Sequence, residues 1–120
     1  MAVLKVISVG VHDMDAAVEF YTKTLGFNVR DDGMAPHFVE LESEGPTLLL
    51  ALCERPSVSD YPAGAAIALN VDVDDAAAAF DRLRSSGVDL VHDSLQDSPV
   101  GPYFAVRDPS GNIIELVQFS

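Results

Sequence analysis

The most constraining feature of this sequence is an order of elements (strand, acidic residue, helix and glycine) that occurs twice. In the first copy, residues 3–11 form an apolar run rich in β-branched side chains, and Asp13 then supplies a capping oxygen for a helix. Apolar residues recur at three- and four-residue spacing along that helix, at Met14, Ala17, Val18, Tyr21 and Leu25. Gly26 is typical of the residue that ends a helix.

The second copy begins with a shorter apolar run at residues 65–71. Asp72 and Asp74 are its candidate helix caps, Gly87 is its stop, and its helix has an apolar face made by Ala76, Ala79, Phe80 and Leu83. A shift of 60 residues aligns Ile7 with Ile67, Val11 with Val71, Asp15 with Asp75, Ala16 with Ala76, Ala17 with Ala77 and Phe20 with Phe80. Single apolar matches are common by chance, so the shared order of elements carries the prediction of an internal duplication.

Strand signals follow each predicted helix, at residues 27–30, 37–42 and 47–53 in the first half and at 88–92, 103–107 and 113–119 in the second. Between the last two, Asp108, Pro109 and Gly111 occupy the positions that suit a type I turn between antiparallel strands. Each half therefore reads β-α-β-β-β. We expect one α+β domain over residues 1–120, with modules at about 1–53 and 65–120 and a Pro- and Ser-containing linker at 54–64.

Charge and composition exclude several classes of protein. Seven Lys and Arg residues against 19 Asp and Glu residues give a net charge of −12, which repels a phosphate backbone and disfavours nucleic acid as a partner. No apolar run approaches the roughly 18 residues of a membrane span, and residues 1–11 read as a strand, not a signal peptide. The single Cys53 has no partner for a disulfide, so we expect a buried thiol and a cytoplasmic location.

Several local sequences resemble the vicinal oxygen chelate superfamily, which includes glyoxalase I, extradiol dioxygenases, fosfomycin-modifying enzymes and bleomycin-binding proteins. They are Asp13 through Phe20-Tyr21, Leu25-Gly26-Phe27, Asp108-Pro109-Ser110-Gly111-Asn112 and Ile114-Glu115-Leu116. The resemblance covers the whole chain and implies the glyoxalase/bleomycin resistance/dihydroxybiphenyl dioxygenase-like fold, in which the two modules form concave mixed sheets. It does not imply one activity, since this scaffold hosts unrelated functions.

The resemblance also implies where metal ligands would stand, on the first and last strands of each module. These positions fall on Val6, on Leu49 or Leu50, on Ala66 and on Glu115, so only Glu115 matches. One carboxylate does not make a metal site, and we expect no metal and no other cofactor. His12, His37 and His92 could rebuild a site in principle, but each is expected to be a surface or turn histidine.

Strand alternation from these positions predicts the lining of the concave face. The floor of this face is predicted to consist of small or apolar side chains, at Val6, Ser8, Gly10, Ala66, Ala68, Ile113 and Val117. By the same alternation, Ala105 and Glu42 are expected on the concave face of their own strands. The predicted ligand-binding residues are Phe38, Glu40, Asn70, Tyr103, Arg107 and Glu115. Because a carboxylate is costly to bury alone, Glu115 should be solvated or hydrogen-bonded, with Arg107 as its candidate partner.

Three functions remain open. The first is a metal-free binding protein of the bleomycin-resistance type, which confers antibiotic resistance by sequestering a cationic or aromatic small molecule. The second is a lyase, an isomerase or a dioxygenase-like enzyme in which Glu115 is the catalytic base or a metal ligand. The third is an accessory domain that only dimerises. A homodimer is expected in any case, because each sheet leaves an open apolar face.

Overall fold

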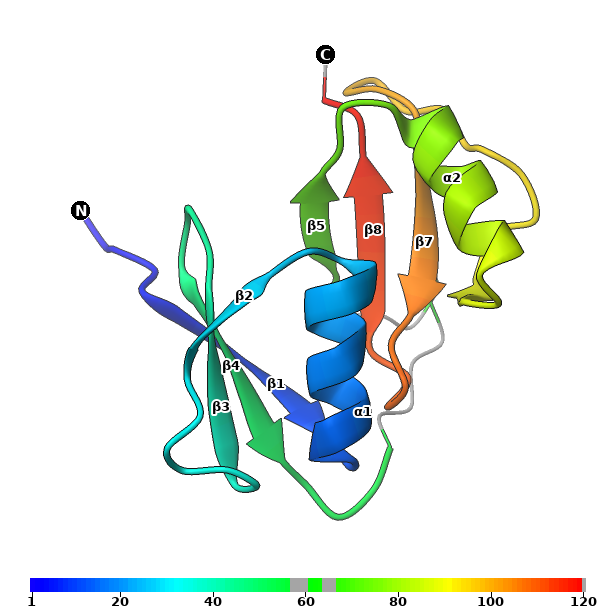
Figure 1. The fold of residues 1–120 in the computed structure, drawn as a ribbon. Coiled ribbons are helices and arrows are strands. Elements are labelled where there is room, and N and C mark those ends of the chain that lie inside the picture. Colours follow the sequence, from blue (N-terminus) through cyan, green and yellow to red (C-terminus); the bar gives the residue numbers. More distant parts are fainter. Residues whose placement is uncertain (57–60, 64–66, 120) are drawn as a thin grey trace. The chain divides into compact units, whose positions relative to one another are not determined.

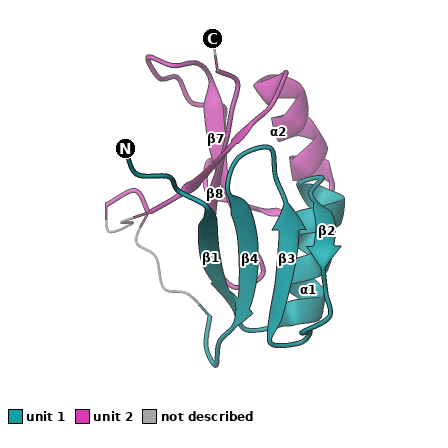
Figure 2. Ribbon diagram, turned by 90° about the vertical axis from the view of Figure 1, so that its left-hand side faces the viewer, with its two compact units in different colours: residues 1–57 teal, residues 58–120 magenta. Residues whose placement is uncertain are grey.

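The computed structural model describes residues 1–56, 61–63 and 67–119. The chain divides into two compact units, residues 1–57 and 58–120, and each unit is described by itself (Figure 2). Each contains one four-stranded mixed sheet and its own helix (Figure 1). The predicted α+β fold of two βαβββ modules is therefore confirmed.

The first unit contains β1 (Val6–Val11), α1 (Met14–Glu19), β2 (Asn28–Asp31), β3 (Phe38–Glu42) and β4 (Thr47–Leu52). Its sheet has the order β1-β4-β3-β2, with β1 and β4 parallel and the other neighbours antiparallel. The Asp13 side chain accepts a hydrogen bond from the backbone N–H of Ala16, which caps α1 as predicted. A π-helical turn, η1 (Phe20–Thr24), continues α1, and Gly26 ends it at a φ of 87°.

The core of the first unit lies between the helix and one face of the sheet. Tyr21, Leu41, Leu50 and Val11 are fully buried there, because strand alternation points every second side chain of each strand toward α1 and η1. The intervening residues of β1 and β3 stand on the opposite face, which has no helix over it among the elements of this unit.

The second unit contains β5 (Leu69–Asp72), α2 (Ala76–Ser85), β6 (Asp89–Leu90), β7 (Tyr103–Arg107) and β8 (Ile113–Val117). The sheet order is β5-β8-β7-β6, with β5 and β8 parallel. The Phe80 ring of α2 meets the Phe104 ring edge-on, with 5.2 Å between centroids. Every second residue of β7 and β8 points toward α2, as Phe104 does, and the residues between them stand on the opposite face of the sheet.

A tight turn joins β7 to β8, as predicted. The Asp108 carboxylate is buried and accepts hydrogen bonds from the backbone N–H groups of Ser110 (2.9 Å) and Asn112 (2.8 Å) and from the Asn112 side chain (3.0 Å). Gly111 has a φ of 87°, which only glycine adopts readily. The turn therefore satisfies its buried carboxylate within four residues of the chain.

Asp72 and Asp74 are wrong as caps of the second helix. The cap is Asp75, whose side chain accepts from the backbone N–H of Ala78 at 3.0 Å. Asp13 and Asp75 are 62 residues apart, whereas Val11 and Val71, the strand residues that precede them, are 60 apart. Two additional residues between Val71 and Asp75 account for this difference.

The 60-residue alignment is therefore wrong within the helices, because each helix takes its phase from its own cap. It fails for Asp15 with Asp75, Ala16 with Ala76, Ala17 with Ala77 and Phe20 with Phe80. Counted from the caps, the buried positions coincide: Met14, Ala17 and Tyr21 in the first unit with Ala76, Ala79 and Leu83 in the second. The duplication thus holds with one offset for the strands and another for the helices.

Several predicted boundaries also change, and the strand expected at 65–71 runs from Leu69 to Asp72. The first strand begins at Val6, the strand expected at 88–92 contains only Asp89 and Leu90, and the last strand ends at Val117. Beyond the strand, the side-chain oxygen of Gln118 accepts from the backbone N–H of Ala76 at the start of α2. Residues 65 and 66, predicted to begin the fifth strand, lie outside the described residues, as does part of the predicted linker.

Cys53 is exposed, which corrects the expectation of a buried thiol. It follows β4 directly and has the parity of Ala51, which alternation places on the face opposite the buried Leu50, and its Sγ is 3.2 Å from the carbonyl oxygen of Arg55. In the described part of the chain, no helix is long and apolar enough to cross a membrane.

Candidate functional site

Glu115 stands on the face of the second unit's sheet that is turned away from α2. Its neighbours in β8, Ile114 and Leu116, are buried on the helix side, so alternation places Glu115 on the other face. The ladder register sets it between Asn70 on β5 and Ala105 on β7. Tyr103 lies on the same face, opposite Val117, as the parity of the strands predicts.

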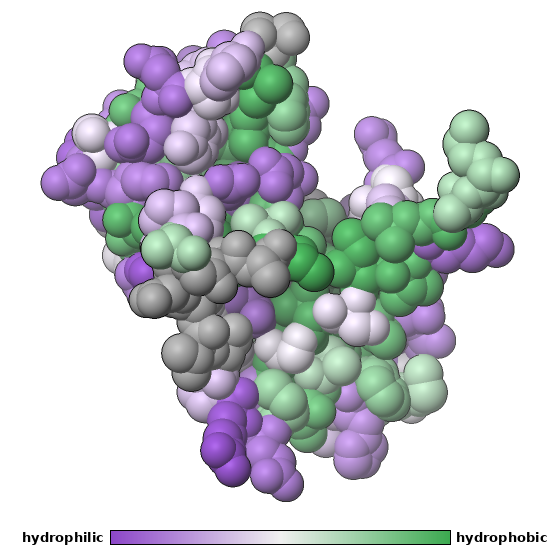
Figure 3. Space-filling model, turned by 180° about the vertical axis from the view of Figure 1, so that it is seen from behind, coloured by the Kyte–Doolittle hydropathy of each residue, from purple (hydrophilic) through white to green (hydrophobic). Residues whose placement is uncertain are grey.

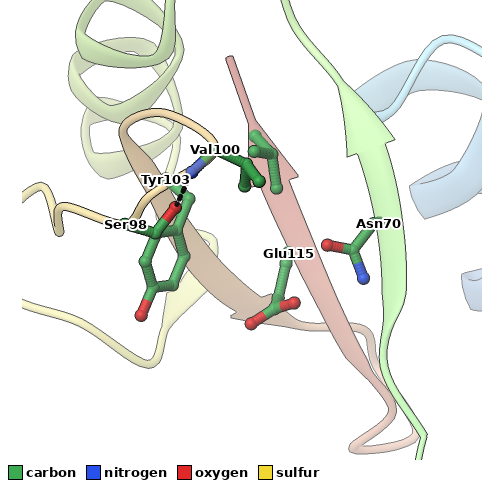
Figure 4. A pocket seen from close by; sticks show the side chains of 6 residues that line it. Asn70, Ser98, Val100, Tyr103 and Glu115 are labelled. Carbon is green, nitrogen blue, oxygen red and sulfur yellow. Dashed lines mark hydrogen bonds between the residues drawn. The ribbon is translucent and has the colours of Figure 1, made fainter. Parts of the chain in front are cut away.

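A pocket of about 260 Å³ opens over this part of the sheet. Its lining residues are Asn70, Ser98, Val100, Tyr103, Glu115 and Val117 (Figure 4). The sheet supplies the floor, and the loop before β7 supplies Ser98 and Val100. That loop is held against β7 by paired backbone hydrogen bonds between Gln96 and Tyr103, at 2.8 and 2.9 Å. The pocket therefore combines a carboxylate, an amide and a phenol with apolar side chains.

The partner of Glu115 is Tyr61, whose hydroxyl donates a hydrogen bond to Oε2 of the carboxylate. Burial, this hydrogen bond, the charge of Glu115 and the nearby Tyr103 together raise the pKa of the Tyr61 phenol well above its ordinary value. The phenol therefore keeps its proton throughout the neutral range and remains a donor. Glu115 is thus hydrogen-bonded, one of the two states expected for a half-buried carboxylate.

His92 connects Tyr61 to Tyr103. Its ring meets both tyrosine rings edge-on, with centroids 6.0 Å and 5.7 Å away. Its Nδ1 accepts a hydrogen bond from the backbone N–H of Ala105 at 3.0 Å, so the proton of the neutral ring is on Nε2. This imidazole takes the place of a backbone acceptor beside β7, which is why β6 ends at Leu90 instead of continuing to His92.

The predicted pairing of Glu115 with Arg107 is wrong. Although Arg107 is on β7, its register partner is Ile113 at the far end of β8, and its guanidinium lies 3.7 Å from the Asp89 carboxylate. Arg107 is also not among the residues that line the pocket. A half-exposed ion pair of this kind contributes little to stability.

Phe38 and Glu40 belong to the first unit, where both stand on the face of β3 opposite α1. Val39 and Leu41 between them are buried under the helix. Phe38 is 40% exposed and, on the same face, Val6 is 49% exposed. Hydrophobic surface gathers over this side of the first unit's sheet (Figure 3). That Phe38 and Glu40 take part in one site with Glu115 stays a prediction.

The donor atoms present do not fit the metal site of the metal-dependent relatives. Val6 has no donor, and Ala66 lies outside the described residues. Gly10 on β1 and Asn70 on β5 are equivalent under the 60-residue shift of the strands. The register pairs Gly10 with Ala51 and Asn70 with Glu115. The structural counterpart of Glu115 in the first unit is therefore Ala51, rather than Leu49 or Leu50. Among the described residues, no three His, Cys, Asp or Glu side chains are grouped closely enough to hold a metal ion.

The three histidines differ in their surroundings. His12 and His37 are exposed, as expected for surface or turn residues, but His92 is half-buried between two tyrosines. Tyr61 was not predicted because it lies in the segment whose Pro and Ser content indicates a linker. The size of Tyr61 could have indicated its role, because a large aromatic residue in an otherwise small and polar segment is a candidate for packing against a neighbouring surface.

Two βαβββ units, each with one helix on one face of a mixed sheet, define the glyoxalase-like class of fold. The sequence profile of the Glyoxalase/Bleomycin resistance protein/Dioxygenase superfamily matches residues 3–116. The chain belongs to this superfamily.

Individual relatives support the assignment over the full length. The uncharacterized protein YurT of Bacillus subtilis is 29% identical over 123 residues, which cover 94% of this chain and 96% of that protein. The crystal structure of TnmS3, an antibiotic binding protein from Streptomyces sp. CB03234, is 29% identical with a TM-score of 0.72 and coverages of 100% and 98%. That of TioX from Micromonospora sp. ML1 is 25% identical with a TM-score of 0.74 and coverages of 99% and 100%.

Proposed function

We propose that this protein is a metal-free small-molecule-binding protein of the bleomycin-resistance type, which sequesters a cationic or aromatic ligand. The observation that carries the proposal is the pocket of about 260 Å³ in which the Glu115 carboxylate and the Tyr103 ring lie together. A carboxylate attracts a cationic group, and an aromatic wall binds a planar or cationic one. The similarity to TnmS3, which is itself an antibiotic binding protein, supports the same function.

Binding without a metal follows from the donors that are present. Glu115 has one oxygen engaged by Tyr61, and the counterpart positions Val6 and Ala51 supply no ligand atom. We expect native mass spectrometry and elemental analysis to give the bare chain. One Zn, Ni, Mn or Fe ion per chain, lost on Glu115→Gln, would contradict the proposal.

The ligand itself can be tested by a thermal-shift screen followed by calorimetry. Glycopeptide, aminoglycoside and phenolic compounds should include binders with a stoichiometry of one per pocket and an affinity that weakens as salt rises, because the chain has a net charge of −12. Glu115→Gln and Tyr103→Ala should each weaken binding, by about 1 kcal/mol for a well-placed group. Binding that neither variant weakens would place the ligand elsewhere.

The same samples separate this function from an enzymatic one. A sequestering protein binds its ligand and releases it unchanged, whereas an enzyme with Glu115 as base would consume it and lose turnover in Glu115→Gln. Mass analysis of the ligand after prolonged incubation with the protein makes the distinction. A chemically altered ligand would overturn the sequestering function.

We also propose that the two units form one domain and that the protein is a cytoplasmic homodimer. The unpaired thiol of Cys53 fits a reducing compartment. The exposed apolar side chains on the open face of the first unit support association with a further surface. The acidic charge disfavours a nucleic-acid partner.

A further inference from the structure

Glu115 does not present a free carboxylate to the pocket. Its Oε2 accepts the hydroxyl of Tyr61, and within the described part of the chain no other hydrogen bond reaches the carboxylate, which leaves Oε1 as the open acceptor. We propose that Tyr61 is a positioning residue that limits Glu115 to one acceptor, so that the pocket selects ligands with an ammonium group over those with a two-pronged amidinium or guanidinium group. This inference rests on the proposed function.

The position of the Tyr61 hydroxyl is supported from a second side. The Tyr61 ring lies against His92, and His92 is tied to the backbone of β7 by the 3.0 Å hydrogen bond from Ala105. His92 also packs edge-on against Tyr103, which lines the pocket. A ligand that displaced Tyr61 from Oε2 would have to disturb this row of three rings.

The selectivity follows from donor geometry. Planar amidinium and guanidinium groups bind a carboxylate best through two parallel N–H···O bonds, which need both oxygens. An ammonium group is a compact charge that needs only one. With Oε2 occupied by Tyr61, an amidinium or guanidinium group can form only one of its two hydrogen bonds to Glu115. If it forms both, it displaces the half-buried Tyr61 hydroxyl, which then has no acceptor. Either outcome weakens the binding of the two-pronged group.

Benzylamine and benzamidine are suitable probes, because they share one aromatic ring and differ in the cationic group. We expect calorimetry to show tighter binding of benzylamine to the wild-type protein. In Tyr61→Phe the second oxygen becomes free, and the ratio of the two dissociation constants should shift about tenfold toward benzamidine, the worth of roughly one hydrogen bond. Tyr21→Phe is the matched control: it removes a hydroxyl from a tyrosine that does not line the pocket, so the ratio should stay unchanged.

The ultraviolet titration of the three tyrosines tests the pairing without any ligand. The absorbance change that is missing from Tyr61→Phe identifies the Tyr61 phenol, and Glu115→Gln should lower the pH at which this phenol ionises, because the carboxylate charge and hydrogen bond both oppose that ionisation. A Tyr61 phenol that ionises at the same pH in the wild type and in Glu115→Gln would show that Tyr61 is not held on Glu115 and would overturn the inference.

The binding results separate the two proposals. If benzylamine and benzamidine bind the wild type but Tyr61→Phe leaves their ratio unchanged, the selectivity assigned to Tyr61 is wrong and the proposed function stands. If neither compound binds, the proposed function fails for cationic ligands and the selectivity fails with it.

Discussion

At the residue scale, one proton lies in the hydrogen bond between the Tyr61 hydroxyl and the Glu115 carboxylate. Its location decides whether the pocket contains a neutral phenol and a charged carboxylate. The raised pKa of the Tyr61 phenol, caused first by burial and then by Glu115, keeps that proton on the tyrosine. Such a shift also affects folding, because the unfolded chain has an ordinary tyrosine with a pKa near 10. Above that pH the unfolded state loses a proton that the folded state retains.

The stability of the folded protein should therefore fall with pH above about 10 more steeply than that of Tyr61→Phe. The contribution of Tyr61 is fully present below pH 10, and it declines by up to about 1.4 kcal/mol per pH unit while only the unfolded state is ionised. Urea unfolding of both proteins at pH 8, 10 and 11 measures the difference. Parallel pH profiles would contradict the assigned shift.

His92 supplies a structural hydrogen bond as well as an aromatic wall. Ala105 is fully buried, and its backbone N–H has the imidazole Nδ1 as acceptor. Removal of this acceptor leaves a buried donor unpaired. His92→Ala should accordingly lower the free energy of unfolding by about 1–3 kcal/mol.

The exposed His37 provides the control, since His37→Ala should change stability by less than about 0.5 kcal/mol. Chemical denaturation of the two variants under the same conditions compares them. Equal effects of the two substitutions would show that the His92 hydrogen bond does not contribute.

At the scale of elements, each helix depends on one aspartate at its first turn. Asp13 and Asp75 have extended backbone conformations, and each accepts a hydrogen bond from the N–H three residues on. This oxygen satisfies one of the donors that a helix start leaves free. The neighbouring Asp74 has the same charge but lies one residue too early to cap α2.

Asp75→Ala should lower the free energy of unfolding by about 1 kcal/mol through loss of the cap. Asp74→Ala removes an equal charge near the same helix end and should have a much smaller effect. Thermal or urea unfolding of the two variants decides between them. A larger loss in Asp74→Ala would show that charge near the helix, and not capping geometry, stabilises its start.

At the scale of the whole molecule, each unit covers only one face of its sheet with its own helix. The first unit's other face carries exposed Val6 and Phe38. Apolar sheet faces are normally covered by a second layer, which in a homo-oligomer can come from another copy. This is the physical basis for the proposed homodimer.

Light scattering at micromolar concentration should give about twice the 12.8 kDa mass of one chain. Phe38→Glu places a charge on the open apolar face and should shift the mass toward the monomer. Met34→Glu, which makes the same apolar-to-acidic change at an exposed residue outside the strands, is the control. A monomeric wild type would contradict the dimer.

The features that neighbouring residues are enough to predict are those whose causes are local. The cap at Asp13, the helix stop at Gly26 and the turn at Asp108 each depend on hydrogen bonds or backbone angles within four residues, so neighbouring side chains are enough to predict them. The alternation of β8 likewise placed Glu115 on the open face of its sheet, and the βαβββ order followed from the same short-range patterns.

The partners of those residues depend instead on how the whole unit folds. Tyr61 and Glu115 are 54 residues apart, and His92 is 13 residues from Ala105, so no local pattern links them. Arg107 had the right charge to pair with Glu115, but the register of β7 and β8 moved it to the opposite end of the strand beside Asp89. Such pairings depend on the register between strands and on the path of loops, and these are settled when the whole sheet packs, not by any single segment.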